Sequence, residues 1–568
     1  MFGYSNGMFG SNGSLYGSNA MTMNSASSAM FSPFQSLSPL SGLWSGNDSP
    51  WASEPALVPA FLDATKSILD GYSQALGQLS SAFSDVLAGQ NGTPGQSPEM
   101  PGQSPEMPGQ SPGVPEPEVP ANDDMAQNVI FMVPDGFGTD YSTAFRTFKG
   151  GEELPAWEAE DMLTGAIKTE SANSLITDSA AAGTAFATGQ KTDNGRISTA
   201  PDGSDLTTLV DLANAAGKST GVVATSTITH ATPAVFGANV DDRDDQHLIA
   251  QQYIDDNKLD VMLGGGRDYF VAEEDGGAGV ADLLSQAESQ GYTLLDSASD
   301  LESVEGDRLL GLFADDALDT SYGESGDDQP TLAQMTQTAL DTLSQNEDGF
   351  FMMVEGSQID WAGHANDAGW AMNDSLAFED AVKTAQQFSE DNPDTLIVIA
   401  PDHETGGMSA QSTQDNNAST YQNFTATYEQ MYVEASERIE AAGMSMDDDG
   451  AAWIMQGAVA EMTGGDVLLT DDELSTVLSA EDSDAGLAAL TQTLNEYGGI
   501  SFSSGNHTAE NVPLYASGPG SDIFSGLLDN TEVGQGLATA MGLEFADAGS
   551  AEVMGVDNQL QANEMAVA

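Results

Sequence analysis

The sequence predicts an α/β fold, in which a central, mostly parallel sheet is flanked by helices on both faces. The first observation is a set of short, continuously apolar runs that suit strands buried on both sides. These runs span 128–135, 220–225, 348–356 and 394–402. The second observation is that segments of helical pattern, such as 205–216 and 372–389, lie between the runs. Buried strands that alternate with helices are typical of an α/β domain.

The composition allows a large core but is strongly acidic. The chain has 568 residues, of which 40% are apolar, and 13 Lys and Arg stand against 88 Asp and Glu, for a net charge of −75. Acidic residues are spread over most of the chain after about residue 115, which favours a halophilic protein over one acidic face for a basic partner. The negative field disfavours nucleic acid and anionic membranes as partners.

Several features narrow the class of protein further. The chain has no cysteine, which excludes disulfides and thiolate metal sites. No apolar run is long enough to cross a bilayer, so no transmembrane segment is expected. The first basic residue is Lys66, and no signal peptide is visible in this sequence. Export, if it occurs, would therefore use another signal, or a part of the precursor that this sequence does not contain.

Composition also divides the chain. Residues 1–55 are a low-complexity segment and are expected to be disordered, while 56–90 carry a heptad pattern that predicts an amphipathic helix. That helix either docks on the main domain or another helix, or serves in oligomerisation or attachment. Residues 91–120 form a proline-rich repeat, expected to be a semi-rigid linker. The main domain is expected at 121–548 and a C-terminal tail at 549–568.

Residues 409–500 interrupt the α/β pattern of the main domain. This segment is acidic and has few strong strand patterns. We expect a loop-like insertion there.

Polar side chains stand where the predicted strands end. The run at 128–135 ends in Asp135, the run at 348–356 contains Glu355 and is followed by Asp360, and the run at 394–402 ends in Asp402. In open α/β sheets, binding sites form at the carboxyl ends of the strands. The sequence therefore predicts a site rich in carboxylates at one edge of the sheet.

Four of the five histidines stand in comparable places: His230, His364, His403 and His507. In so acidic a chain, a carboxylate beside a histidine is weak evidence by itself. Asp360 and His364 would also suit a surface helix pair, and Asp402 and His403 would also suit a helix cap. Taken together, carboxylates and imidazoles without thiolates are ligands that zinc accepts, and oxygen ligands suit magnesium.

The stretch "ITDSAAAGT" at 176–184 places Ser179 before a run of small residues. Such a serine is either a nucleophile that a large group can approach or simply the start of a helix. A nucleophilic serine needs a partner that activates its hydroxyl. No histidine is free for this role if the histidines bind metal.

Seven fragments of the chain resemble the alkaline phosphatase family and occur in that family's order. They are "PDGFG", "ITDSAAAGTAFATGQKT", "THATPA", "DVMLGGGRDYF", "VEGSQIDWAGHAND", "APDHETGG" and "GNHTAE". The resemblance runs from about 128 to about 520. It implies an alkaline-phosphatase-like sheet with 409–500 as a crown or lid. It also implies hydrolysis of phosphate monoesters to alcohol and inorganic phosphate through a phosphoserine intermediate, with two Zn²⁺ and one Mg²⁺.

The resemblance also implies residue roles. Ser179 is implied as the nucleophile, with Arg243 as the phosphate clamp that Asp178 orients. The implied metal ligands are Asp360, His364 and His507 for the first zinc, Asp402, His403 and Asp135 for the second, and Asp135, Thr232 and Glu355 for magnesium. His230 and Trp361 occupy positions that vary among members and bear on magnesium affinity and substrate release.

The family is usually dimeric and periplasmic or extracellular, so a homodimer in such a location is expected. Other functions remain compatible with the sequence. A phosphodiesterase or sulfatase of the same superfamily would share the strand-end Asp/His set and differ around the nucleophile. A surface attachment protein acting through the N-terminal segment, or an acidic metal-storage protein, would need neither Ser179 nor Arg243.

Overall fold

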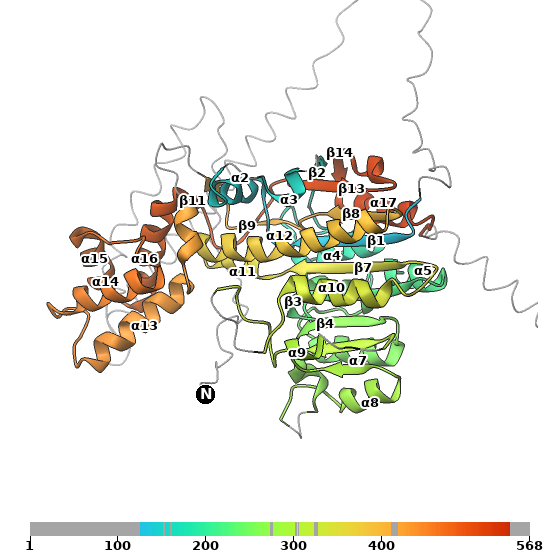
Figure 1. Ribbon diagram of the computed structural model, residues 1–568, viewed down its shortest axis with the longest axis horizontal. Helices are drawn as coiled ribbons and strands as arrows, with labels where there is room; N and C mark the ends of the chain where they lie inside the picture. The colour runs from blue at the N-terminus through green and yellow to red at the C-terminus, as the bar shows by residue number, and fades with distance from the viewer. Residues whose placement is uncertain are drawn as a thin grey trace, which may run out of the picture. The chain divides into compact units, whose positions relative to one another are not determined.

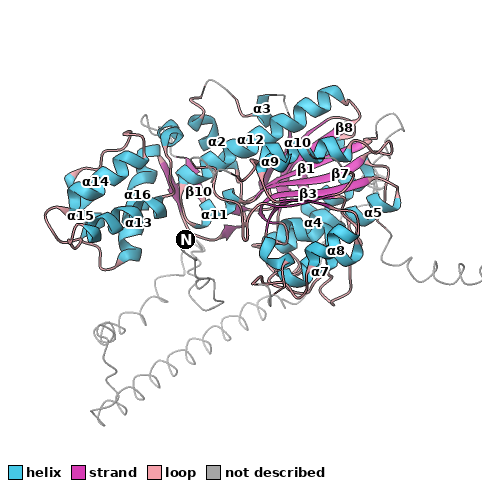
Figure 2. Ribbon diagram, turned by 60° about the horizontal axis from the view of Figure 1, so that its bottom comes forward, coloured by secondary structure: helices cyan, strands magenta, loops and turns pink. Residues whose placement is uncertain are grey.

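The computed structural model describes residues 125–545 except 152–153, 160–161, 273–275, 302–303, 305, 323–327 and 411–417. The predictions for 1–55, 56–90, 91–120 and 549–568 lie outside the described residues. Within the described part, the α/β fold is confirmed, with a sheet of ten strands between two layers of helices (Figures 1 and 2).

The ten strands lie in the order β14-β2-β13-β8-β1-β7-β3-β4-β6-β5. Their bounds are β1 Asn128–Pro134, β2 Leu163–Lys168, β3 Ser219–Thr227, β4 Val261–Gly265, β5 Thr293–Leu295, β6 Leu309–Leu312, β7 Phe350–Gly356, β8 Thr395–Ile399, β13 Val512–Ser517 and β14 Gly526–Asp529. All neighbouring pairs are parallel except those of β13, which runs antiparallel to both β8 and β2. The four predicted apolar runs correspond to β1, β3, β7 and β8, which are adjacent at the centre of the sheet.

The central strands are buried on both faces because helices cover both. In β1, Val129, Phe131 and Val133 belong to one apolar cluster, whereas Ile130 and Met132 belong to the other. This alternation follows from the two-residue period of a strand. One cluster also contains apolar residues of α10 and α12, and the opposite cluster contains residues of α4, α5, α6 and α17.

Side chains cap the N-termini of six described helices of the main domain: α4, α5, α8, α10, α12 and α17. The α-helices are α2 Thr139–Phe148, α3 Ala156–Ala159, α4 Ser179–Thr188, α5 Leu209–Ala215, α6 Ala231–Gly237, α7 Gln246–Asp256, α8 Leu283–Ser289, α9 Ala298–Leu301, α10 Leu332–Leu343, α11 Gln358–His364, α12 Ala368–Asp391 and α17 Asn530–Ala540. The predicted helix at 205–216 begins later, as α5, because Thr208 caps it and forms a capping box with Asp211. The predicted helix at 372–389 is part of the longer α12, which Asp367 caps.

The expectation that 409–500 is loop-like was wrong. Its described part forms α13 Tyr428–Ala441, α14 Ala451–Met462, α15 Asp471–Leu478 and α16 Ser483–Gly498. In α13, the residues Tyr428, Met431, Tyr432, Ala435 and Ile439 are buried at helical spacing. The many acidic residues on the outer faces make the helical spacing of the buried residues hard to recognise in the sequence.

We call residues 418–498 the helical insertion. Short strands join it to the main domain: β10 (Met408–Ala410) before it pairs antiparallel with β11 (Ile500–Phe502) after it. A second small pair joins β9 (Glu404–Thr405) and β12 (His507–Thr508). The helices α13 to α16 form a group beyond the end of the sheet at which α11 lies (Figures 1 and 2). The crown or lid role of this segment stays a prediction.

Candidate functional site

Three central strands bring the predicted carboxylates to one edge of the sheet. Asp135 follows the end of β1, Glu355 lies near the end of β7, and Asp402 lies three residues beyond β8. Because β8, β1 and β7 are parallel neighbours, their carboxyl ends lie side by side. All three carboxylates are buried, as is His403 beside Asp402. Burial of so many ionisable groups is costly unless they are paired or bind cations.

The helix α11 follows β7 and brings Asp360 and His364 to the same edge. Its close approach depends on Gly136, which follows Asp135 with a φ of +76°. A Cβ atom at Gly136 would lie 2.7 Å from the Asp360 Cα. A larger residue there would therefore force α11 away from the end of β1, besides adopting an unfavourable left-handed conformation.

Asp135, Asp402 and His403, which we call the strand-end group, offer ligand atoms that all lie within 4.8 Å of one another. His403 Nε2 is 3.2 Å from Asp402 Oδ2 and 3.7 Å from Asp135 Oδ1. Neither of these two carboxylate oxygens has a hydrogen-bond partner. Burial, followed by neighbouring carboxylates, raises the pKa of Asp135 well above its usual value and raises that of Asp402 to about 6. A cation would compensate this crowding of negative charge.

Asp360, His364 and His507 form a second set, which we call the helix–loop group. His364 Nε2 lies 3.1 Å from His507 Nε2 and 3.4 Å from Asp360 Oδ2. The ligand atoms of Asp360, His403 and His507 all lie within 4.8 Å of one another. Asp360 and His507 do not form such a compact set of three with His364. The rings of His403 and His507 stack with centroids 3.6 Å apart. His403 therefore stands between the two groups.

The hydrogen bonds of the helix–loop group determine which imidazole nitrogens are protonated. His364 Nδ1 lies 2.9 Å from the Gly505 carbonyl oxygen, and His507 Nδ1 lies 2.9 Å from the Thr177 carbonyl oxygen. A carbonyl only accepts, so each Nδ1 donates, and in the neutral rings each Nε2 carries a lone pair. These lone pairs face each other and repel unless a cation, a proton or a metal ion, lies between them. A backbone carbonyl that orients a histidine in this way is typical of metal ligands.

Thr405 is a candidate site residue that the sequence reasoning missed. Its hydroxyl donates to Asp360 Oδ1 and lies 3.2 Å from His403 Nδ1, so it links the two groups. Since the hydroxyl proton is used by Asp360, Thr405 accepts from the His403 Nδ1–H, and His403 Nε2 keeps its lone pair toward the strand-end carboxylates. The position of Thr405 in "DHET", two residues after His403, was the available signal.

Thr232 and Glu355 lie on the other side of Asp135. The Thr232 hydroxyl donates to Asp135 Oδ2 at 3.2 Å, and Ser226, also missed, donates to Glu355 Oε2 at 3.3 Å. Glu355 Oε1 is buried without a partner, and burial raises the pKa of Glu355 to about 7. Oxygen donors of this kind fit a hard cation.

Ser179 is the first residue of α4 and lies against this edge. Its hydroxyl oxygen is 3.2 Å from His403 Nε2. Asp178 caps the helix, its Oδ1 accepting from the Ala181 N–H at 3.0 Å. The small residues after Ser179 allow close packing, since a Cβ at Gly183 would already lie 3.0 Å from Val235. The nucleophile candidate is thus held rigidly at a helix N-terminus, where anions are favoured.

Arg243 lies in the loop between α6 and α7 and is fixed by two side chains. Its Nη1 donates to Asp178 Oδ2 at 3.1 Å, and its Nη2 lies 3.1 Å from His230 Nε2. Burial, and then the charge of Arg243, lowers the pKa of His230 to about 3, so the neutral ring accepts this bond. Trp361 contacts the edge of the His230 ring at 5.9 Å between centroids. The guanidinium is therefore oriented beside Ser179 through Asp178.

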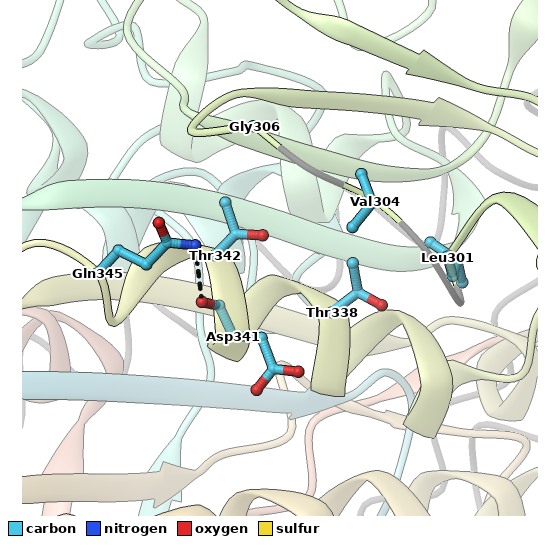
Figure 3. Close-up of a pocket in the computed structure, with 7 residues that line it drawn as sticks. All are labelled: Leu301, Val304, Gly306, Thr338, Asp341, Thr342 and Gln345. Carbon is cyan, nitrogen blue, oxygen red and sulfur yellow. Dashed lines mark hydrogen bonds between the residues drawn. The ribbon is translucent and has the colours of Figure 1, made fainter.

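A separate pocket of about 370 Å³ lies between α10 and the segment before β6 (Figure 3). Asp341 is the one ionisable side chain among its described lining residues, and Gln345 bonds the backbone of Asp341. The pocket thus lacks the mixture of groups seen at the strand ends. Across the described residues, no helix combines the length and hydrophobicity needed to span a bilayer.

The fold and site together define an α/β protein with a buried carboxylate–imidazole centre that could hold cations, beside a serine at the first position of a helix. The alkaline phosphatase family matches residues 126–543. Alkaline phosphatase 3 of Bacillus subtilis is 36% identical over 439 residues, which cover 74% of this chain and 90% of that protein. The chain therefore belongs to the alkaline phosphatase family, and it is a phosphomonoester hydrolase.

Solved structures agree with this assignment. A cold-active alkaline phosphatase from a psychrophilic Shewanella species has a TM-score of 0.64 and 32% identity, over 73% of this chain and 99% of that one. A histidine-to-aspartate mutant of the alkaline phosphatase from the Antarctic bacterium TAB5, with Mg bound in its M3 site, has a TM-score of 0.54 and 28% identity, over 74% and 99%. The expected enzyme class is confirmed, and metal cofactors are implied.

Proposed function

We propose that this enzyme hydrolyses phosphate monoesters through a phosphoserine intermediate on Ser179, with two Zn²⁺ and one Mg²⁺ as cofactors. The observation that carries the proposal is the placement of Ser179. Its hydroxyl lies 3.2 Å from His403 Nε2, and His403 belongs to both clusters of potential metal-ligating atoms. A nucleophile in this position adjoins both cation sites at once.

The donor sets suggest which residues hold which ion. The helix–loop group would hold one zinc and the strand-end group the other, since both combine imidazole with carboxylate. Asp135, Thr232 and Glu355 would hold magnesium, for which oxygen ligands are preferred. The TAB5 structure with Mg in its M3 site supports a third centre of this kind. When bound, the ions supply Lewis acidity that stabilises negatively charged oxygen atoms.

The chain's own residues then perform the transfer. Arg243, held by Asp178 and His230, binds two phosphoryl oxygens through its planar guanidinium. The Ser179 oxygen, whose proton passes to water, attacks phosphorus as the ester P–O bond breaks, and the leaving alkoxide takes up a proton from water and departs as the alcohol. Water then attacks the phosphoserine, which releases inorganic phosphate and restores Ser179. Because Ser179 must be deprotonated, we expect activity to rise toward alkaline pH.

His403 also lies within hydrogen-bond distance of Ser179, which raises the alternative that it acts as a general base. The unpartnered oxygens of Asp135 and Asp402 argue against this role, because they face the same nitrogen. Burial also lowers the pKa of His403 well below its usual value, which makes it a weak proton acceptor. The two roles differ in one respect: a general base would keep working after metal removal.

The proposal also covers the substrates, the salt environment, the oligomeric state and the location of the enzyme. Simple phosphate monoesters and inorganic phosphate are the expected ligands, and phosphodiesters or sulfate esters are the rival substrates. The charge of −75 supports a halophilic enzyme. A homodimer in the periplasm or outside the cell is proposed from family resemblance alone.

The deciding experiment compares p-nitrophenyl phosphate, its bis-ester and p-nitrophenyl sulfate as substrates of the wild type and Ser179→Ala. We expect the monoester to be preferred, chelation to abolish turnover, zinc with magnesium to restore it, and Ser179→Ala to lack a burst of phosphoenzyme. Turnover that survives in Ser179→Ala would overturn the covalent mechanism. Turnover that survives chelation would instead favour His403 as a base.

A further inference from the structure

The helical insertion reaches the helix–loop group through two buried side chains, Asn495 on α16 and Tyr428 on α13. Their exposed fractions are 5% and 1%. Both contact the junction between α11 and α12, formed by Asn366 and Asp367, which Ala365 separates from His364, the last residue of α11. In Figure 1, α13 to α16 lie beyond the end of α12 that follows α11.

The junction has a conformation that needs support. Asn366 has a φ of +54°, in the left-handed region. Its N–H donates to Gly363 O at 3.0 Å, and the Asp367 N–H donates to Ala362 O at 2.9 Å, which closes the end of α11. A left-handed non-glycine residue costs roughly 1 kcal/mol and persists only where its surroundings hold it.

Asn495 bonds both sides of this junction. Its Nδ2 donates to the Asn366 carbonyl at 2.8 Å, and its Oδ1 accepts from the Ala368 N–H at 3.3 Å. The Tyr428 hydroxyl donates to the same Oδ1 at 3.3 Å and accepts from the Gly369 N–H at 3.1 Å. The first N–H groups of a helix have no partner inside it, so the insertion satisfies two of those of α12.

Asp367 adds a third connection between the same parts. Its Oδ1 caps α12 by accepting from Trp370 N at 2.8 Å, and its Oδ2 accepts from Tyr428 N at 2.7 Å. The end of α11 is thus held by side chains and backbone of the insertion. On its other side, His364 is held by Gly505, which follows β11 where the chain leaves the insertion.

We propose that Asn495 is a positioning residue for His364, so that the helical insertion braces the helix–loop group. This inference rests on the proposed zinc at that group. The strand-end group depends on the sheet instead, because Asp135 and Asp402 follow β1 and β8 and do not lie on α11. Loss of Asn495 therefore loosens one metal centre and spares the other.

The test measures zinc bound per chain of the full-length enzyme against a graded chelator. His364→Ala, which removes a ligand, identifies the release step of the helix–loop group. In Asn495→Ala we expect that step at a chelator concentration lower by about 10-fold, the usual size for a residue that supports a ligand. The step of the strand-end group stays at its wild-type position. Gln492→Ala is the matched control, since Gln492 is exposed on the same helix and bonds only Glu496 among the contacts described.

A second variant guards against misfolding of the first. Tyr428→Phe keeps the ring and the backbone bond to Asp367 but removes the hydroxyl, and we expect a smaller shift of the same release step. Release of both zincs at wild-type concentrations in the two variants would overturn the inference, as would an equal shift of both steps. Failure of the proposed function is distinguishable, because the wild type itself would then bind no zinc.

Discussion

Asp178 serves two roles that substitution can separate. One carboxylate oxygen caps α4 through Ala181 N, and the other accepts from Arg243 Nη1 at 3.1 Å and from Gly195 N at 2.9 Å. Asp178→Ala removes all three bonds, whereas Asp178→Asn keeps an oxygen for the cap and loses the charge that attracts Arg243. The two variants therefore differ in stability more than in phosphate binding.

The contacts give the expected size of each effect. Loss of an N-cap costs about 1 kcal/mol of unfolding free energy. A hydrogen bond to a charged group contributes about 1.5–3 kcal/mol, but the side chains of Arg243 and Asp178 are 23% and 18% exposed, which favours the low end. We expect Asp178→Ala to lose about 2.5 kcal/mol of stability, the cap and the bond to Arg243 together, and Asp178→Asn, which keeps the cap, about 1.5 kcal/mol. Loss of arginine orientation lowers kcat/KM in both by about 10-fold or more, since each factor of ten corresponds to about 1.4 kcal/mol.

Denaturant unfolding and p-nitrophenyl phosphate kinetics check these values, with inhibition by inorganic phosphate as a second measure of the anion site. Asp282→Ala is the control, because Asp282 caps α8 in the same way, through Ser285 N at 3.0 Å, away from Arg243. Asp282→Ala is expected to lose the unfolding free energy that a helix cap contributes and to keep the wild-type kinetics with p-nitrophenyl phosphate. Wild-type phosphate inhibition in Asp178→Asn would refute the reasoning that Asp178 orients Arg243.

Three further predictions concern the metal ligands, the charge and the core. Thr405→Val removes the hydroxyl that links Asp360 and His403 and is expected to weaken zinc retention about 10-fold, while Thr405→Ser restores it; equal retention in both would mean the hydroxyl is dispensable. The unfolding free energy is expected to rise from dilute buffer to molar NaCl, because salt screens the charge of −75, and a flat salt series would contradict the halophilic hypothesis. Burial raises the pKa of Asp374 to about 7, above its value in the unfolded chain. Its contribution to the free energy of unfolding is therefore fully present below about pH 4 and is lost as pH rises through 7. Asp374→Asn should therefore gain stability over the wild type at pH 8 relative to pH 5, and a pH-independent difference between the two proteins would rule this out.

Much of the candidate site was accessible from the sequence because its ligands follow strands that are apolar without interruption. Asp135, Glu355 and Asp402 could be placed at one edge from the strand pattern alone, and the structure brings them together there. The seven ordered fragments supplied Ser179 and the histidines, and the spacing after "THATPA" supplied Arg243. Local pattern is informative here because strand order and parallel direction constrain where the chain can turn back.

The helical insertion shows where pattern reasoning failed. Acidic residues cover its outer faces and hide the helical spacing of Tyr428, Met431 and Ile439. Its helices are stabilised by packing on one another and on α12, which is a property of the assembled chain. Composition could indicate a departure from the α/β pattern at 409–500 but not the structure that replaces it.

By itself, then, the sequence determined the α/β class, the central strands and the identity of the residues at their ends, because continuous hydrophobicity and strand-end polarity are local properties. Only the tertiary structure decided how those residues pair: His403 between both groups, Thr405 linking Asp360 to His403, and Asn495 holding the turn after His364. These contacts join residues up to about 270 positions apart, as His403 and Asp135 are, where geometry depends on packing rather than on local pattern.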